Sequence, residues 1–255
     1  MTIRHAGLTD VGRKRAHNED RFLIQSEDDL FVVCDGMGGH ASGEIASQLA
    51  VDEIGAFFKS SRGDDEVTWP YKADRKLSQA EARLSVAVRW GNFRVFEKAS
   101  TAIQLKGMGT TCVSCHFADG EMAIAHVGDS RCYRVRDGAI EQMTEDHSLL
   151  NDYKKMAVLT PEEEKNFPHK NIIVRALGLK ESVLVDIQHH RPQVGDVYLM
   201  CSDGLSGEVE DPDIERIMRE CGQDIESAAH NLIQSACDHG GKDNVTTVLA
   251  RVESL

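Results

Sequence analysis

An apolar run that ends abruptly in an aspartate and glycines restricts the fold of this chain more than any other feature. Residues 30–34 have the composition of a buried strand, and Asp35 follows at once within the stretch DGMGG. The glycines allow the backbone to approach a ligand closely, and a carboxylate at a strand end suits a hard cation or a phosphate. Taken alone, the stretch is explained equally well by a Gly-rich turn that the aspartate caps.

The same pattern returns at four further aspartates. Asp20, Asp129, Asp203 and Asp243 each stand, like Asp35, at the margin of a predicted strand. Because neither histidine nor cysteine recurs in this position, all-oxygen ligation of Mg²⁺ or Mn²⁺ is favoured over a zinc site. Asp129 on its own is explained as well by a turn aspartate that accepts hydrogen bonds from the nearby backbone.

The hydropathy pattern predicts strands and helices with antiparallel pairing in the middle of the chain. Asp119-Gly120 and Asp137-Gly138 lie between extended runs and are strong hairpin signals. The section 149–170 has no clear period, and we expect a lid there. The predicted strands cover 3–10, 21–26, 30–35, 111–117, 121–127, 131–136, 183–189, 196–201 and 245–252, and the predicted helices cover 42–58, 78–100, a segment from 211, and 224–238.

Length and charge narrow the class of protein. The 255 residues include 29 Lys and Arg against 42 Asp and Glu, which gives a formal charge of −13. Nucleic-acid-binding proteins carry basic patches, so this balance argues against one and is compatible with a carboxylate-lined site that needs cations. An ordinary acidic surface explains most of the charge. No linker or low-complexity tract divides the chain, and we predict a single domain over 1–255.

Cysteine usage and hydropathy predict a reduced environment away from the membrane. The N-terminus has no basic region followed by an apolar stretch, and no apolar run approaches the roughly 18 residues of a membrane span. The seven cysteines are scattered and odd in number, which fits free thiols in a cytosol. Cys112 and Cys115 form a CxxC, but positions three apart on a strand face opposite sides, which argues against a zinc or redox pair.

Several carboxylates gathered in one place imply a particular chemistry. They repel one another unless cations neutralise them. Two ions roughly 3.5–4 Å apart can share a carboxylate and lower the pKa of a bound water toward neutrality. The resulting hydroxide can attack phosphorus while Arg15 holds the phosphoryl oxygens. The residues therefore predict metal-assisted hydrolysis of a phosphoester. Asp146-His147 would form an acid–base pair only if the two side chains faced each other, which adjacency in the sequence does not ensure.

Other catalytic templates fail at single residues. The lysine of Gly240-Gly241-Lys242 is followed by aspartate instead of the Ser or Thr of a P-loop. The run 204–207 (GLSG) lacks the second spacer of a nucleophile elbow, and no HExxH occurs.

A series of short motifs makes the chain similar to a known family. They are Arg15 with NED at 18–20, DGMGGH at 35–40, GMGTT at 107–111, HVGDSR at 126–131, EDHS at 145–148, RALG at 175–178, CSDGL at 201–205 and GGKDNVT at 240–246. In this order they resemble the bacterial PPM-type (type 2C) metal-dependent serine/threonine protein phosphatases, from about Asp10 to Val252. The resemblance implies an α+β fold, an α-β-β-α sandwich of two antiparallel sheets packed face to face and flanked by helices, with a flap subdomain at about 149–172.

The resemblance also implies which residues hold metal. Asp35 would bridge two ions, and Gly36 would offer its carbonyl oxygen. Asp203 and Asp243 would complete the site of the first ion, and Asp20 would hold waters of the second.

Further roles are implied for residues around these ligands. Glu19 would stand behind the second ion's site, Asp129 together with the first ion's ligand at 203 would form a third, weaker metal site, and Arg15 would bind the phosphate. Eukaryotic members have a histidine two positions after the bridging aspartate, proposed as the leaving-group acid. This chain has Met37 there, so His40 or a metal-bound water would take that role and His40 would contact the substrate.

The implied activity is the hydrolysis of phosphoserine and phosphothreonine in proteins, with two Mn²⁺ or Mg²⁺ ions and a third at the weaker site. The implied partners are phosphorylated proteins that a bacterial Ser/Thr kinase modifies, without nucleic acid or membrane insertion, and we expect a cytoplasmic monomer. Two alternatives stay open: a catalytically silent relative that binds phosphoproteins, and a small-molecule phosphatase on the same fold. Silent relatives typically lose metal carboxylates, and here all five are present, which favours an enzyme.

Overall fold

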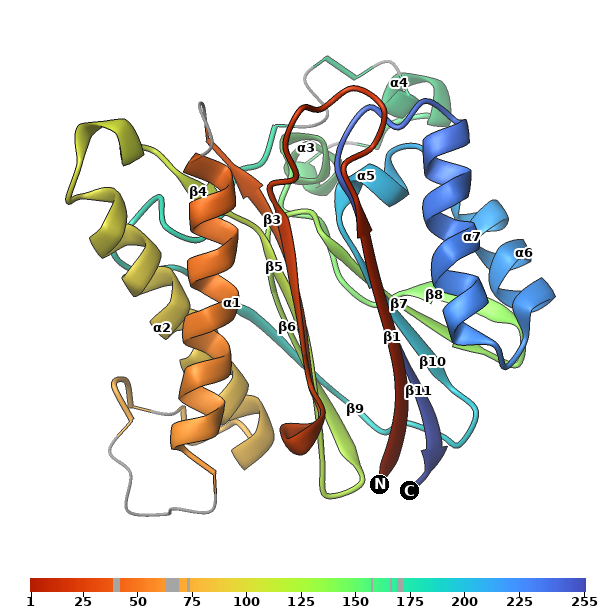
Figure 1. The fold of residues 1–255 in the computed structure, drawn as a ribbon, viewed down its shortest axis with the longest axis horizontal. Helices are drawn as coiled ribbons and strands as arrows, with labels where there is room; N and C mark the ends of the chain where they lie inside the picture. Colours follow the sequence, from red (N-terminus) through yellow and green to blue (C-terminus); the bar gives the residue numbers. More distant parts are fainter. Residues whose placement is uncertain (39–41, 63–68, 73, 157, 166, 169–171) are drawn as a thin grey trace.

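Two antiparallel sheets pack face to face, and helices cover both outer faces (Figure 1). The computed structural model describes residues 1–38, 42–62, 69–72, 74–156, 158–165, 167–168 and 172–255. The α-β-β-α sandwich that the sequence predicts is therefore confirmed. Among the described residues, no helix combines the length and the hydropathy of a membrane span.

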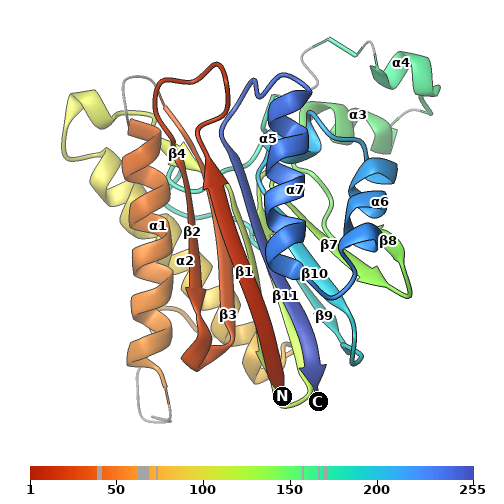
Figure 2. The same cartoon turned by 45° about the vertical axis from the view of Figure 1, so that its right-hand side comes forward.

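The first sheet, called sheet A, pairs strands from opposite ends of the sequence. Its strand order is β1 (Thr2–Asp10), β11 (Val245–Ser254), β10 (Val197–Cys201), β7 (Arg131–Arg136) and β8 (Ala139–Gln142). β1 and β11 run side by side over their whole length, as both views show (Figures 1 and 2). The hairpin predicted at Asp137-Gly138 joins β7 to β8, and both residues have the positive φ that a tight hairpin turn needs.

The second sheet, sheet B, holds most of the middle of the chain. Its order is β2 (Asp20–Gln25), β3 (Leu30–Met37), β5 (Cys112–Ala118), β6 (Glu121–Val127) and β9 (Asp186–His190), and the short β4 (Gly109–Thr110) pairs with the end of β3. The predicted hairpin at Asp119-Gly120 joins β5 to β6 in antiparallel pairing. β9 is shifted from the prediction at 183–189, because Val183 and Val185 pack as a loop against the core beside the helices.

Amphipathic helices bury the outer face of each sheet. α1 (Ser42–Ser60) and α2 (Gln79–Ala99) cover sheet B, and α6 (Asp211–Cys221) and α7 (Ile225–Asp238) cover sheet A. The capping box predicted at the start of α2 is present: Ser78 accepts a hydrogen bond from the Glu81 backbone, and the Glu81 carboxylate accepts one from the Ser78 backbone.

The predicted lid contains short helices instead of an irregular chain. α3 (Leu149–Met156) and α4 (Pro161–Lys165) lie at one end of the sandwich, and α5 (Asp203–Ser206) follows β10 (Figure 1). Two 3₁₀ turns, η1 (Ser26–Asp28) and η2 (Ile103–Leu105), complete the described elements. Helices of one or two turns contain too few periods to be recognised from hydropathy.

The layer between the sheets is apolar along most of its length and polar at one end. Because side chains alternate along a strand, the inward row of β2 that contains Phe22 ends at Asp20, and the inward row of β3 that contains Val33 ends at Asp35. The apolar part of this layer contains Phe31, Val33, Val113, Cys115, Phe117, Met122, Ile124, Cys132, Tyr198, Met200, Val248, Ala250 and Val252. The fold thus places two predicted ligands at the same end of the sandwich.

Candidate active site

Asp20 joins the two sheets through hydrogen bonds. It begins β2 in sheet B, and its Oδ2 accepts hydrogen bonds from Ser202 Oγ at 2.8 Å and from Thr246 Oγ1 at 2.7 Å, both in sheet A or just beyond its strands. The side chain is buried, and its Oδ1 has no partner among the described residues. Burial raises the pKa of Asp20 to about 7, although the two hydroxyls lower it.

Asp35 lies opposite Asp20 in the register of β3 against β2. Its backbone is fixed by Thr111, whose Oγ1 accepts a hydrogen bond from the Asp35 N–H at 2.9 Å and whose N–H donates to the Asp35 carbonyl at 2.8 Å. Burial, followed by the charges of Asp20 and Asp203, raises the pKa of Asp35 well above its usual range. A Cβ on the next residue, Gly36, would lie 2.2 Å from a backbone oxygen, so only glycine fits there.

Three more aspartates lie within the electrostatic reach of this pair. Burial raises the pKa of Asp203, and neighbouring Asp243 raises it further. Burial also raises the pKa of Asp129 to about 7, and the charge of Asp203 adds to that shift. The structure therefore brings together all five aspartates that the sequence singles out, and their mutual repulsion is the physical sign of it.

The donor set fits a hard divalent cation. Within the described part of the chain, Oδ1 of Asp20, of Asp129 and of Asp203 is buried and lacks a hydrogen-bond donor. Buried carboxylate oxygens without donors are costly, and a cation would satisfy them and remove the repulsion that raises these pKa values. Because the set is made of carboxylate oxygens, Mg²⁺ or Mn²⁺ suits it better than zinc.

Arg15 places a positive charge at the solvent-exposed side of the cluster. Arg15 Nη2 is 2.5 Å from Asp243 Oδ2, and the arginine side chain is 51% exposed. Burial lowers the pKa of Arg15, but the charges of Asp243 and Glu19 raise it more, so this guanidinium is permanently charged. Burial raises the pKa of Glu19, which lies beside Arg15. The arginine can therefore meet an anion that arrives from solvent.

Several residues that build this site were missed by the sequence reasoning. Asn244 holds the loop that carries Arg15: its Oδ1 accepts from the Glu19 N–H at 2.8 Å, and its Nδ2 donates to the carbonyl oxygens of Val11 and His17. Ser202, Thr246 and Thr111 were missed as well. Their signal was available, because each lies within three residues of a singled-out aspartate or within the quoted GMGTT motif.

The remaining candidates from the sequence are His40, the pair Asp146-His147 and the CxxC cysteines. His40 lies outside the described residues. The proposed acid–base pair Asp146-His147 is wrong, because the Asp146 carboxylate pairs with Arg131 at 2.8 Å and the His147 ring is bonded elsewhere. Cys112 packs under the helices while Cys115 lies between the sheets, so the CxxC thiols face opposite sides as expected.

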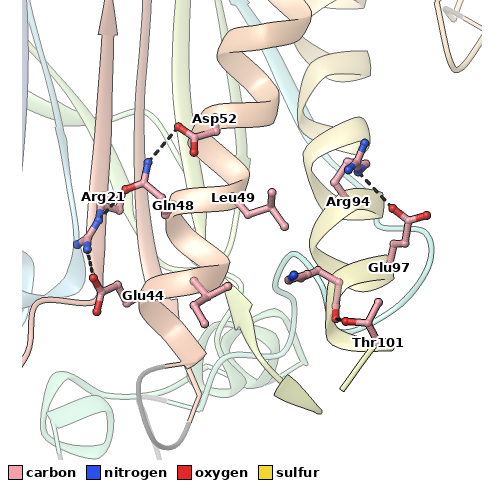
Figure 3. A pocket seen from close by; sticks show the side chains of 10 residues that line it. Arg21, Glu44, Gln48, Leu49, Asp52, Arg94, Glu97 and Thr101 are labelled. Carbon is pink, nitrogen blue, oxygen red and sulfur yellow. Dashed lines mark hydrogen bonds and ion pairs between the residues drawn. The ribbon is translucent and has the colours of Figure 1, made fainter. Parts of the chain in front are cut away.

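A groove of about 580 Å³ lies between α1 and α2 (Figure 3), and none of the five aspartates of the cluster lines it. Arg21 lines it, paired with Glu44 at 2.6 Å, whereas neighbouring Asp20 faces the inner layer. Adjacent residues of a strand point to opposite sides of the sheet, so β2 separates the groove from the site.

Comparison with known proteins identifies the family. The family model described as protein phosphatase 2C matches residues 11–235. The chain belongs to the protein phosphatase 2C family. Serine/threonine phosphatase stp of Listeria innocua, a similar protein, is 35% identical over 244 residues, which are 94% of this chain and 92% of stp.

A mycobacterial relative extends the comparison to solved structures. Serine/threonine protein phosphatase PstP of Mycobacterium tuberculosis is 36% identical over 252 residues, which are 99% of this chain and 45% of PstP. The chain therefore spans about half the length of that relative. A crystal structure of the PstP catalytic domain in complex with two manganese ions has a TM-score of 0.84 and 35% identity, covering 99% of each chain.

Proposed function

We propose that this chain is a metal-dependent protein serine/threonine phosphatase that hydrolyses phosphoserine and phosphothreonine in proteins. The observation that carries the proposal is the cluster of five aspartates at one end of the sandwich. Burial raises the pKa of four of them, Asp20, Asp35, Asp129 and Asp203, and three of their carboxylate oxygens lack donors among the described residues. Membership of the protein phosphatase 2C family, and relatives named as serine/threonine phosphatases, support it.

The aspartates are proposed to hold Mn²⁺ or Mg²⁺ ions. Asp35 would serve two ions, and Gly36 would offer its carbonyl oxygen. Asp203 and Asp243 would complete the site of the first ion, and Asp20 would hold waters of the second. Asp129, which lies near Asp203, would hold a third ion. When bound, such ions neutralise the carboxylates, attract the phosphoryl oxygens and make a water molecule acidic enough to act as a nucleophile near neutral pH.

The chain's own residues are proposed to position these ligands and the phosphate. Ser202 and Thr246 occupy one oxygen of Asp20, so that the other oxygen is left for a cation. Arg15 neutralises Asp243 in the metal-free site, and its remaining N–H groups face solvent, where they can donate to the oxygens of a phosphoryl group.

We propose that His40 or a water molecule is the acid that protonates the leaving group, as the sequence indicates. A phosphoserine leaving group is a poor one, so its departure depends on protonation. If His40 is the acid, the substitution His40→Ala should change the pH–rate profile for an alkyl phosphate substrate. The profile for an aryl phosphate, which has a good leaving group, should stay unaltered. An unaltered profile with both substrates would assign the proton to water.

Phosphate release from a phosphothreonine peptide tests the proposed function. We expect activity with Mn²⁺, none with EDTA, and a collapse in Asp243→Asn, because that variant loses a carboxylate of the cluster. Asp213→Asn, at an exposed surface ion pair on α6, is the matched control and should behave like the wild type. A folded, Mn²⁺-loaded protein that is inactive on several phosphopeptides would favour a silent phosphoprotein-binding relative, and a strong preference for a phosphorylated metabolite would favour a small-molecule phosphatase.

We further propose a setting for this activity. The substrates would be phosphoproteins made by a bacterial Ser/Thr kinase, and the chain would act as a cytoplasmic monomer, a single domain with a flap at about 149–172. The flap carries Lys154 and Lys155, which pair with Glu164 and Glu145, so exchangeable charges are available there for substrate contacts. Sedimentation of the Mn²⁺-loaded protein tests the monomer, and release of phosphate from kinase-treated proteins tests the substrate class.

A further inference from the structure

Two stacked histidines lie beside the turn that carries Asp129. The ring centroids of His126 and His147 are 4.7 Å apart with 16° between their planes, and both side chains are buried. The Asp186 carboxylate approaches His147, with 3.2 Å between Oδ2 and Nε2. The three residues bring ligand atoms within 4.8 Å of one another. Two roles therefore have to be compared, a second metal centre and a device that positions the turn.

The hydrogen bonds of His147 argue against a metal. The Gly128 N–H donates to His147 Nδ1 at 3.0 Å, so the proton of the neutral ring is on Nε2 and is donated to Asp186. A metal at Nε2 would move this proton to Nδ1, where it would face the Gly128 N–H. Arg175 adds a permanent positive charge, with Nη1 2.5 Å from Asp186 Oδ1 and 3.0 Å from His147 Nε2. The buried Nδ1 of His126, which lacks a partner among the described residues, is the feature that favours a metal.

The same contacts hold the Gly128 peptide from both ends. The ring of His147 accepts from the Gly128 N–H, and the backbone N–H of His147 donates to the Gly128 carbonyl at 2.9 Å. On its other side Gly128 packs so closely on Thr111 that an added Cβ would lie 2.7 Å from the Thr111 Cβ. Thr111 Oγ1 is also 2.7 Å from Ser130 Oγ. The turn around Asp129 thus has fixed neighbours on each side.

We infer that His147 is a positioning residue for Asp129: Arg175 and Asp186 orient the imidazole, and the imidazole holds the Gly128 peptide that leads into Asp129. The inference rests on the proposed function, in which Asp129 binds a cation. Partners that orient a metal ligand typically affect metal affinity or activity about 10–100-fold when they are removed. His147 also lies at the base of the flap, because its carbonyl accepts from the Val174 N–H at 2.9 Å.

The relay consists of two hydrogen bonds of the His147 ring, one to Asp186 and one to the Gly128 N–H. Two substitutions of His147 separate these two contacts. In His147→Asn the amide oxygen can take the place of Nδ1 and accept from the Gly128 N–H, but the side chain is too short to reach Asp186. In His147→Gln the amide can reach Asp186, but no acceptor remains at the place of Nδ1. Both variants remove the ring and its stacking on His126, so a general loss of packing affects them alike. His189→Gln, at a half-exposed histidine of β9 paired with Glu121, is the control outside the relay.

The first readout is hydrogen exchange of the Gly128 amide in the metal-free protein, measured by NMR. We expect protection in the wild type, in His147→Asn and in His189→Gln, and exchange about 10-fold faster or more in His147→Gln. The second readout is Mn²⁺ binding by calorimetry: the weakest binding step should weaken about 10-fold or more in His147→Gln and by less than about 3-fold in His147→Asn. Equal behaviour of the Asn and Gln variants in both readouts would overturn the inference.

Additional variants distinguish the inference from misfolding, from a failure of the proposed function and from a metal site at the histidines. If His147→Gln does not fold, Asp186→Asn, at a partly exposed carboxylate, should increase Gly128 exchange in the same direction, and no change there would count against the relay. Asp129→Asn tests the proposed function separately: if it leaves every Mn²⁺ binding step unchanged, Asp129 is not a ligand, whereas the Gly128 exchange still reports on His147. A Co²⁺ absorption band in Asp35→Asn protein that disappears with His147→Gln would make the histidines a metal site and overturn the positioning role.

Discussion

Replacing Asp20 by asparagine is the most direct test of the aspartate cluster, because the shape is kept and the charge is removed. Burial raises the pKa of Asp20 from an ordinary value of 3.8 to about 7 in the metal-free protein. At pH 8 the carboxyl is ionised in the folded and the unfolded chain, and the difference in pKa opposes folding by about 4 kcal/mol. At pH 5 the folded carboxyl is protonated, and the opposition falls to about 2 kcal/mol.

The asparagine should remove this opposition at a smaller cost. Its oxygen can accept from Ser202 and Thr246, and its amide then takes the place of the Oδ1 that lacks a partner among the described residues. Burying an unsatisfied amide costs about 1–3 kcal/mol. We therefore expect metal-free Asp20→Asn to be more stable than the wild type by about 1–3 kcal/mol at pH 8, and equal to it within about 1 kcal/mol at pH 5.

Urea unfolding followed by circular dichroism, in EDTA at both pH values and again with Mn²⁺, measures these differences. With Mn²⁺ the order should reverse, because the wild type gains binding energy that the variant lacks, and phosphatase activity should fall about 10-fold or more. A variant that is destabilised equally at pH 5 and pH 8 would refute the reasoning about burial. A variant that Mn²⁺ stabilises as much as the wild type would refute the place of Asp20 in the metal site.

Three further predictions follow from single contacts. Gly204→Ala should be inactive and destabilised by about 2 kcal/mol or more, because its Cβ would lie 1.9 Å from the Asn244 carbonyl oxygen; thermal unfolding and phosphate release measure both effects, and a variant like the wild type would contradict this close packing. Arg15→Lys should raise KM for a phosphopeptide about 10-fold with a smaller effect on kcat, since the planar fork is lost; a pure kcat effect in initial rates would contradict a role in phosphate binding. Burial raises the pKa of Asp196, but its ion pair with Arg136 outweighs burial and holds that pKa below its usual range. The pair therefore stabilises the fold above about pH 4, and this stabilisation is lost as the pH falls through the lowered pKa of Asp196. Urea unfolding of Arg136→Gln should therefore show a loss of stability at pH 6 that shrinks toward pH 3, and a constant loss would exclude the linkage.

Local sequence signals predicted most of the elements and the residues of the cluster. Asp119-Gly120 and Asp137-Gly138 have one structural solution in common, a two-residue turn with positive φ, so their hairpins were readable. Asp20 and Asp35 were readable as strand-end carboxylates, and the structure adds that they are directly opposite each other. The alternation of side chains along β2 and β3, once the register is known, requires both to face the inner layer.

The parts that were not predicted depend on contacts between distant segments. The motif around Thr246 indicates a place near the site, but it does not indicate that the hydroxyl meets the Asp20 carboxylate 226 positions earlier in the chain. Adjacency in the sequence could not decide whether Asp146 and His147 pair, and in the folded protein Arg131 binds the first side chain and Asp186 the second. Strand register and the choice of ion-pair partner are set by tertiary structure, which a single sequence encodes only indirectly.

The position of β11 has a consequence for the order in which the molecule is completed during synthesis. β11 lies between β1 and β10, so β1, the earliest of the described strands, has its neighbour in sheet A only when residues 245–254 have been made. Asp243 and Thr246 arrive with the same segment. A nascent chain therefore carries three of the five aspartates of the cluster before β10 is made and a fourth just after it, and it cannot assemble the complete cation-binding cluster before translation has reached the segment that contains Asp243 and Thr246.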